Sequence, residues 1–450
     1  MMKQTRREFL KTSAAALALG GISMAQESKP NFVIIYTDDH GCGDLGCCGS
    51  KDVLTPNLDA LAKNGVRFTN WYSNSPVCSP SRASLLTGKY PQRAGIPHIL
   101  GGKRGTPGLK PGQTTLAQAL KPLGYKTGIF GKWHLGVGQE YGPNAHGFDE
   151  FFGFMAGCVD YYSHIFYWGQ GGGVNPLHDL WHNEDEVWSN GRYLTELITE
   201  KAVEFIKKAD QPFFLYVPYN APHYPMHAPQ KYLDRFPNLP PEKRIMAAMI
   251  AAVDDGVGDI VKACPPNTVL FFSSDNGPSR ETRNWLDGTE GAYPGGSANG
   301  FRGEKFSLFE GGIRMPAIMS GQGIPKGQVC DKVGAMMDIF PTFLEMAGGR
   351  AEGACPELVE GIDGSSILPM LNDAPSPHER LFWDYSNQLA VRQGKWKLVL
   401  NGKLVGEKPD EVHLSDLDSD PGECTNLKDR QPDLVKELTQ AAQDWQASLK

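Results

Sequence analysis

Four short apolar runs, each followed at once by polar side chains, constrain the fold of this chain most strongly. The runs begin at Asn31 ("NFVIIYTDDHG"), Tyr125 ("YKTGIFGKWHLG"), Pro212 ("PFFLYVPYNAPHYP") and Thr268 ("TVLFFSSDNG"). Short, almost continuous apolar runs are typical of strands buried on both faces of a parallel sheet. Between them lie stretches with helical spacing of apolar residues, such as "LTELITEKAVEFIKKA" from Leu194. This alternation predicts an α/β fold with a mostly parallel sheet flanked by helices.

The polar residues that follow these runs are expected to meet in one site. Ligands of such sheets bind beyond the carboxyl ends of the strands, and all four polar clusters fall there. A single cluster would be read as an ordinary solvated loop, whereas four together indicate a site. The residues concerned are Asp38, Asp39, Lys132, His134, His223, Asp275 and Asn276.

Both ends of the chain differ from this pattern. Residues 1–25 carry Arg6 and Arg7, a short apolar stretch broken by glycine, and small residues at Ser23 and Ala25. This predicts a twin-arginine export signal, hence a periplasmic or secreted protein that uses the twin-arginine machinery and has no stable membrane span. Residues 27–371 are expected to form the catalytic domain. Residues 372–450 are expected to form a smaller α+β subdomain of antiparallel strands and a closing helix.

Charge and cysteine content narrow the possibilities further. The formal net charge of −7 argues against general nucleic-acid binding, which needs a basic surface. The nine cysteines are an odd number for an exported protein. If one of them is consumed chemically, eight remain that could pair.

Cys78, in "SPVCSPSRASLLTG", is the cysteine in the most unusual setting. Pro80 suits the first position of a helix, so Cys78 is expected just before a helix N-terminus, where the pKa of a thiol is lowered. That would suggest a plain cysteine nucleophile. However, the aspartates and Asn276 form an all-oxygen set that matches Ca²⁺ or Mg²⁺, and a hard cation is a poor partner for a thiolate. The nucleophile beside such a cation should be oxygen.

These motifs resemble those of the formylglycine-dependent sulfatases, an arylsulfatase-like family of the alkaline-phosphatase-like superfamily. "CSPSR" followed by "LLTGK" resembles the sulfatase signature, whose cysteine a formylglycine-generating enzyme oxidises to 3-oxoalanine. "YTDDHG", "GKWHLG", "APHYP", "SSDNG" and "RGEKFSLFEGGIRMP" resemble further family motifs and occur in the same order. The one departure is Lys89, where the signature usually has arginine, and this keeps the charge.

The resemblance implies the alkaline-phosphatase-like fold, one bound Ca²⁺ and hydrolysis of sulfate esters. Cys78 becomes formylglycine, whose aldehyde hydrates to a diol, and one hydroxyl attacks sulfur. His223 then protonates the leaving oxygen, and His134 deprotonates the second hydroxyl so that sulfate is expelled. Arg82 holds the diol, while Lys132 and Lys305 neutralise the sulfuryl oxygens. The implied metal ligands are Asp38, Asp39, Asp275 and Asn276, together with the formylglycine formed from Cys78.

Two other functions stay open at this point. The first is hydrolysis of phosphate or phosphonate monoesters, which relatives in the same superfamily can perform. A two-zinc phosphatase would need more histidine ligands than these motifs supply. The second is a catalytically silent protein that binds sulfated glycans, although the residues needed for catalysis are all present.

The substrate is predicted only as a class. The aromatic-rich insert from Phe151 to Trp188 favours a carbohydrate sulfate over a small aryl sulfate, because aromatic rings can stack on sugars. Polar residues of the insert could bind a sugar or could belong to an ordinary surface loop. These residues are Asp160, Tyr161, His164, His178 and His182.

Overall fold

The structure is a computed structural model that describes residues 29–168, 174–281, 295–348 and 361–449. The predicted export signal at residues 1–25 lies outside the described residues. Among the helices of the described part, none has the length and apolarity required to cross a membrane.

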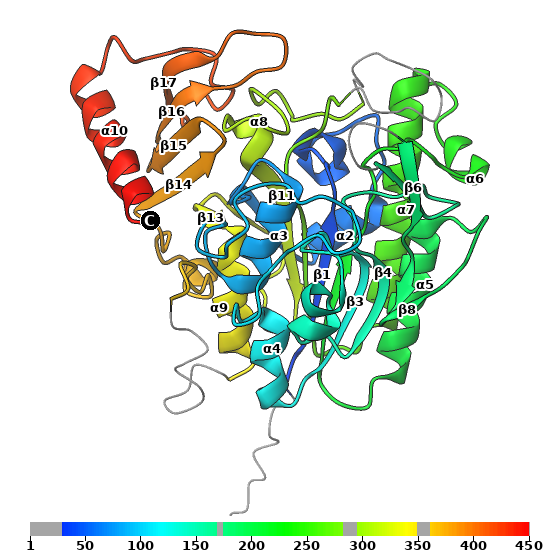
Figure 1. The fold of residues 1–450 in the computed structure, drawn as a ribbon. Coiled ribbons are helices and arrows are strands. Elements are labelled where there is room, and N and C mark those ends of the chain that lie inside the picture. Colours follow the sequence, from blue (N-terminus) through cyan, green and yellow to red (C-terminus); the bar gives the residue numbers. More distant parts are fainter. Residues whose placement is uncertain (1–28, 169–173, 282–294, 349–360, 450) are drawn as a thin grey trace, which may run out of the picture.

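Eleven strands of the described chain form one mixed, mostly parallel sheet at the centre of the molecule (Figure 1). The four strands predicted from the apolar runs are neighbours in the order β10 (Thr268–Ser274), β1 (Asn31–Thr37), β9 (Phe213–Pro218) and β3 (Lys126–Lys132). They are all parallel. Their carboxyl ends therefore share one edge, as predicted.

The remaining strands extend this sheet on both sides. Beyond β10 lie the antiparallel β11 (Arg314–Gly321), then β2 (Gly65–Tyr72), which pairs with both β12 (Gln328–Cys330) and β13 (Gly334–Ala335). Beyond β3 lie β4 (Glu150–Phe154), β7 (Trp181–His182) and β8 (Asp185–Glu186). A separate two-stranded hairpin pairs β5 (Ile165–Trp168) with β6 (Val174–His178).

Helices cover both faces of the sheet because alternate side chains of each strand point to opposite faces. In β1, Val33 and Ile35 pack into one core, while Phe32, Ile34 and Tyr36 pack into the other. The first core is closed by α2 (Pro56–Lys63), α5 (Leu194–Lys208) and α7 (Pro241–Ala263), with the short α6 (Gln230–Leu233) against α7. The second is closed by α3 (Cys78–Thr87), α4 (Leu116–Leu120) and α9 (Ile339–Met346) (Figure 1).

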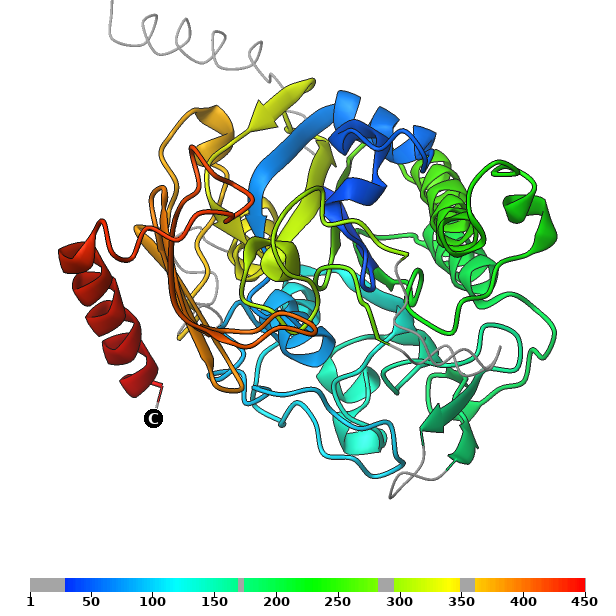
Figure 2. The same ribbon diagram turned by 90° about the horizontal axis from the view of Figure 1, so that it is seen from above.

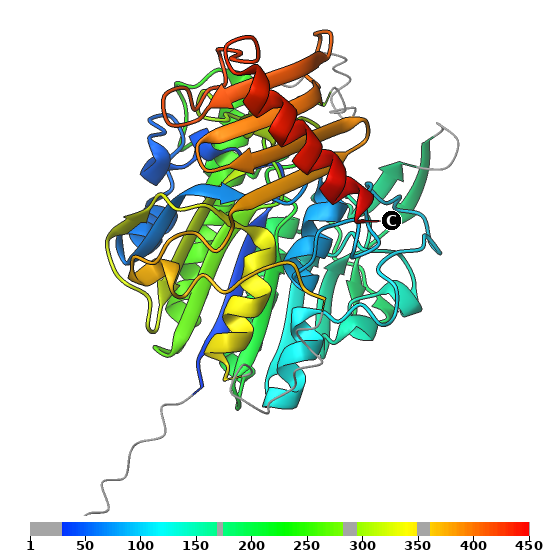
Figure 3. The ribbon, with the colours of Figure 1, turned by 90° about the vertical axis from the view of Figure 1, so that its left-hand side faces the viewer.

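The C-terminal residues form a small antiparallel sheet beside the main body (Figure 2). Its strands are β14 (Arg380–Tyr385), β15 (Gln388–Gln393), β16 (Trp396–Gly402) and β17 (Asp410–Asp416). Helix α10 (Pro432–Ala447) lies across the outer face of this sheet (Figure 3). Antiparallel strands and a closing helix were predicted here, whereas the domain boundary between residues 371 and 372 stays a prediction.

The inner face of this small sheet holds the segment that carries Lys305. Gln388 of β15 donates from Nε2 to the carbonyl of Phe306 at 2.7 Å. Lys397 of β16 is fully buried and pairs with Glu310, in α8 (Glu310–Ile313), at 2.8 Å and with Glu423 at 3.2 Å. Removing one member of a buried ion group leaves the other charges uncompensated, which is costly. This ion group therefore connects the small C-terminal sheet to the segment that follows Lys305.

The eight cysteines in the described residues are all free thiols. The pairing considered from the odd cysteine count is therefore not formed among them. The ninth, Cys355, lies outside the described residues.

Candidate active site

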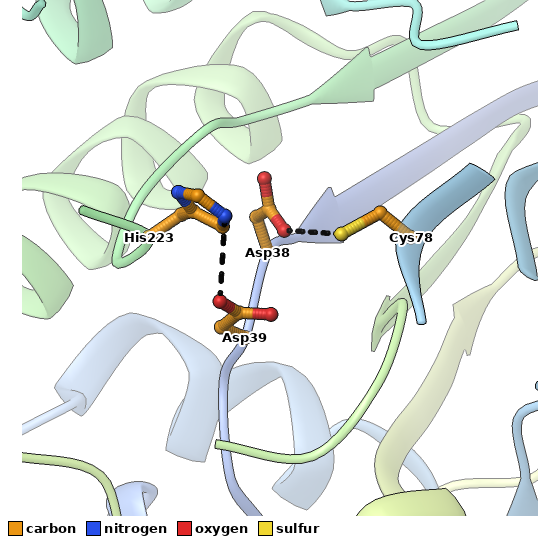
Figure 4. A group of neighbouring side chains, drawn as sticks. All are labelled: Asp38, Asp39, Cys78 and His223. Carbon is orange, nitrogen blue, oxygen red and sulfur yellow. Dashed lines mark hydrogen bonds and ion pairs between the residues drawn. The ribbon is translucent and has the colours of Figure 1, made fainter. Parts of the chain in front are cut away.

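The predicted site residues converge at the carboxyl ends of the four central strands. Asp38 and Asp39 directly follow β1, and Asp275 and Asn276 directly follow β10. His223 lies in the loop after β9. Figure 4 shows Asp38 and Asp39 at the end of their strand, with Cys78 and His223 reaching them from different elements. The expectation that the polar clusters meet is confirmed by the contacts that follow.

Cys78 is the first residue of helix α3, with Val77 as its N-cap. Pro80 is thus the third helical residue, so the helix begins earlier than the proline predicted. The Cys78 Sγ donates a hydrogen bond to Asp38 Oδ1 at 3.6 Å (Figure 4). Burial raises the pKa of the Cys78 thiol well above its usual value, although Lys132 and Lys305 oppose this. The expected lowering by the helix N-terminus is wrong, and the thiol is not poised as a thiolate nucleophile.

Each of the three aspartates at the centre lies against at least one buried cation. Lys132 Nζ lies 2.5 Å from Asp38 Oδ2, and Arg82 Nη2 lies 2.6 Å from Asp275 Oδ2. Lys305 Nζ lies 2.9 Å from Asp39 Oδ2. All six side chains are at most 3% exposed. Such close pairs offset the cost of burying the charges.

The pKa values of this group reflect burial first and neighbouring charges second. Burial raises the pKa of Asp39 to about 7, against the opposing charge of Lys305. Burial and then Asp38 raise the pKa of Asp275. For Lys132, burial is the largest effect and works against the charged form, but the negative groups around it, Asp38 first among them, together outweigh it and the pKa rises. The aspartates are therefore crowded anions that a further cation would relieve.

The oxygen donors of this cluster fit a hard divalent cation. Ligand atoms of Asp38, Asp39, Cys78 and His223 lie within 4.8 Å of one another. The Oδ1 of Asn276 is buried without a hydrogen-bond partner in the described structure, which leaves it available to a cation. Carboxylate and amide oxygens are the ligands preferred by Ca²⁺ and Mg²⁺. The residues present therefore suit such an ion.

Two site residues adopt the left-handed backbone conformation, which tertiary contacts must stabilise in residues other than glycine. Asp39 has φ of 60° and His134 has φ of 55°, both in the left-handed region. For residues other than glycine this conformation is uncommon, and it gathers at functional sites. It turns the chain sharply just after β1 and β3.

His134 is oriented through one ring nitrogen. Its Nε2 donates to the carbonyl of Leu100 at 3.0 Å, so this nitrogen carries the proton. Its buried Nδ1 has no hydrogen-bond partner among the described residues. Burial, followed by the charge of Lys132, holds the pKa of His134 well below its usual value. A neutral imidazole with a free Nδ1 lone pair can accept a proton.

Gly157 is expected to be required at its position because it lies against the His134 ring. A Cβ at residue 157 would lie 2.7 Å from His134 Cε1 and 2.8 Å from Nε2. We predict that Gly157→Ala lowers kcat about 10²-fold by displacing the ring, since misplacements of about 1 Å can cost that much. Gly101→Ala is the matched control, because its Cβ would meet only Thr106 Oγ1 at 3.7 Å. Equal activity of both variants with wild type, measured at saturating substrate, would contradict the role of Gly157.

Hydrogen bonds fix both the ring and the backbone of His223. The Nδ1 of His223 donates to the carbonyl of Tyr224 at 2.8 Å, and the hydroxyl of Tyr161 donates to the carbonyl of His223 at 2.9 Å. This leaves Nε2 facing Lys305 Nζ at 3.3 Å. Burial and then the charge of Lys305 hold the pKa of His223 well below its usual value. The neutral Nε2 therefore faces the Lys305 ammonium group as a hydrogen-bond acceptor.

A cavity of about 410 Å³ opens onto these residues. Sequence reasoning placed Cys78, His134, His223 and Lys305 at the site, and all four line this cavity. Phe166 comes from the aromatic insert, but none of the insert's proposed sugar-binding residues lines the cavity. Further lining residues, none of which was named as a site residue from the sequence, include Leu100, Lys103, Gly157, Cys158, Glu281 and Phe306.

The polar residues of the insert instead make contacts within the protein. Asp160 accepts hydrogen bonds from the backbone of Tyr162 and Ser163, and His164 contacts the carbonyl of Arg192. His178 contacts Glu186. These contacts favour the interpretation of an ordinary loop, apart from the support that Tyr161 gives to His223.

Comparison with known proteins assigns the family. The sulfatase family model matches residues 30–349, and the chain therefore belongs to the sulfatase family. Two curated relatives are N-acetylgalactosamine-6-sulfatase of Mus musculus and arylsulfatase A of Bos taurus. The first is 32% identical over 96% of this chain and 89% of its own length. The second is 33% identical over 96% of this chain and 90% of its own length.

A solved structure gives the same result for the fold. The crystal structure of Ps i-CgsB in complex with k-i-k-neocarrahexaose is 30% identical, with a TM-score of 0.81 over 93% of each chain. The predicted sulfatase resemblance and the predicted fold class are thus confirmed, and the chain is a sulfuric ester hydrolase.

Proposed function

We propose that this sulfatase hydrolyses sulfate esters of carbohydrates, with Cys78 converted to formylglycine and one Ca²⁺ bound at the three aspartates. The observation that carries the proposal is the position of Cys78. Its Sγ contacts Asp38 among the three buried carboxylate–cation pairs, in the cavity that His134, His223 and Lys305 also line.

The proposed metal ligands are Asp38, Asp39, Asp275 and Asn276, beside residue 78. When bound, the cation would supply positive charge that favours an anionic oxygen at this position. The raised pKa of the unmodified thiol supports a nucleophile other than sulfur. The formylglycine residue would supply an oxygen nucleophile in its hydrated form.

The chain's own residues would orient the ester and move protons. Arg82 and Lys132 lie against Asp275 and Asp38, where their charge stabilises anionic oxygens at residue 78. We assign His223 Nε2 as the donor to the leaving oxygen once the imidazole is protonated, with the Lys305 ammonium group beside it at 3.3 Å. We assign the free Nδ1 of His134 as the base that helps to release sulfate.

Support for a carbohydrate substrate comes from the relatives and from the cavity. The relatives include a protein named for N-acetylgalactosamine 6-sulfate and a structure in complex with a neocarrahexaose. The cavity of about 410 Å³ is large enough for a sugar unit. Desulfation of a panel of sulfated mono- and disaccharides, followed as released sulfate, tests this part. Turnover of aryl sulfates alone would contradict it.

We predict that His223→Ala harms substrates with poor leaving groups most. A general acid is worth roughly 10²–10⁴-fold, and less when the leaving group is already acidic. For a sugar sulfate we expect a loss in that range, whereas a nitrophenyl sulfate should lose much less. His182→Ala is the control, because that side chain is 53% exposed and outside the cavity. A uniform loss across leaving groups would argue against the acid role.

Export and maturation are part of the same proposal. Residues 1–25 would direct the chain through the twin-arginine machinery to the periplasm or outside. A formylglycine-generating enzyme would act on Cys78 before or during this step. The sulfatase motif around Cys78 and the paired Arg6 and Arg7 support these partners.

A further inference from the structure

Lys103 is the one charged residue of the described cavity wall that lacks an ion-pair partner among the described residues. The other charged wall residues, Lys305 and Glu281, pair with each other at 2.8 Å. We propose that Lys103 binds a second anionic group of the glycan, so that the substrate carries a negative charge besides the reacting sulfate. The inference rests on the proposed function and specifies its substrate.

The segment around Lys103 is held close to the reacting residues. The backbone N–H of Leu100 donates to Ser79 Oγ at 3.1 Å, next to Cys78, and the carbonyl of Leu100 accepts from His134 Nε2 at 3.0 Å. Gly102 packs so closely that a Cβ there would lie 2.6 Å from the Phe166 ring. The chain therefore presents Lys103 from a fixed backbone, and this reduces the ordering cost of binding.

The other charges of the site balance one another without Lys103. Asp38, Asp39, Asp275 and Glu281 supply four negative charges, and the three cations Arg82, Lys132 and Lys305 are paired with them. The proposed divalent cation and a singly charged sulfate ester would together neutralise this inner group. The positive charge of Lys103 is then matched only by a further anion on the substrate.

Either a second sulfate or a uronate carboxylate has the required chemistry. Both accept charge-assisted hydrogen bonds from a lysine ammonium group. Such a hydrogen bond to a charged group contributes enough to change affinity by about 10- to 100-fold. A neutral sugar ring at the same place would gain none of this.

The test compares three disaccharides with one reacting sulfate each. One carries a second sulfate, one carries a uronate carboxylate, and one carries neither. For Lys103→Gln we expect kcat/KM to fall about 10- to 100-fold on the anionic members, mainly through KM, and less than about twofold on the neutral one. Lys103→Arg should retain most of the preference. A loss on only one anionic member would identify sulfate or carboxylate as the recognised group.

Arg104→Gln is the matched control for long-range charge effects. Arg104 is the next residue, but it pairs with Glu186 at 2.8 Å and lines a different cavity. Binding titrations of the same sugars to Cys78→Ala protein, with and without Lys103→Gln, give a readout independent of turnover. Equal losses on all three sugars, or the same selectivity loss in Arg104→Gln, would overturn the inference. In that case, continued hydrolysis of the sugar sulfates by Lys103→Gln and Arg104→Gln would leave the proposed function intact.

Discussion

Cys78→Ala is expected to lose hydrolysis of sulfate esters by about 10⁴-fold or more, the scale seen when an enzyme loses its nucleophile. The side chain of Cys78 is 2% exposed and contacts Asp38 at the centre of the site. Alanine cannot be converted to an aldehyde, so no oxygen nucleophile can form at this position. Initial rates on an activated aryl sulfate measure the loss.

Cys158→Ala is the matched control for that variant. Cys158 is also buried and lines the same cavity, but its position carries no sulfatase signature and is not among the proposed nucleophile, metal-binding or proton-transfer residues. We expect this variant to keep most of its activity and both variants to melt cooperatively near the wild-type temperature. In wild type, the peptide with Cys78 should be about 18 Da lighter than its thiol form. An unmodified Cys78 in fully active protein would contradict the proposed maturation.

Removal of the divalent cation is expected to abolish activity and to lower the melting temperature by about 3 °C. The three buried aspartates repel one another, so a bound cation stabilises the folded state by about 2.7 kcal/mol at a hundredfold excess over Kd. Dialysis against a chelator, then addition of Ca²⁺ or Mg²⁺, should reverse both effects. Melting curves give a readout that does not depend on catalysis. Full activity and an unchanged melting temperature after removal would contradict the metal site.

The same experiment has an expected pH dependence. The pKa of Asp39 is about 7 in the metal-free fold, against an ordinary value near 4. Between these values the folded metal-free state binds more protons than the unfolded state, so this group's stabilising contribution is present at low pH and is lost as pH rises through 7. The cation competes with that proton. The rise in melting temperature on adding Ca²⁺ should therefore be larger at pH 8 than at pH 6.

The convergence of the site could be predicted from sequence because it follows from strand direction alone. β1 and β10 are each followed directly by polar residues that can bind a cation. Because β10, β1, β9 and β3 are parallel neighbours, their carboxyl ends share one edge of the sheet, and this brings those polar residues together. Cys78 was recognisable from its flanking motif. Its detailed setting was not, because burial outweighs the helix N-terminus in setting its pKa.

Other parts of the site could not be predicted because they depend on contacts between distant segments. Glu281 and Lys103 belong to no periodic pattern, and only the folded chain places them in the cavity with Lys305. The role of Gly157 follows from the position of the His134 ring, which sequence spacing does not encode. Conversely, the histidines of the aromatic insert had suggestive residue types but make internal contacts.

The sulfatase activity proposed for this site is tested most directly on paired esters of the same alcohol, one a sulfate and the other a phosphate or phosphonate. Four carboxylates, three cations and one divalent ion together carry a net charge of +1, which matches the single charge of a sulfate monoester rather than the nearly double charge of a phosphate monoester; the protein groups are Asp38, Asp39, Asp275, Glu281, Arg82, Lys132 and Lys305. We predict that kcat/KM for the sulfate exceeds that for the phosphate or phosphonate, and that Cys78→Ala and chelation each abolish the sulfate reaction. A preference for the phosphate or phosphonate ester, or sulfate turnover that persists in Cys78→Ala, would contradict a sulfatase site built on residue 78.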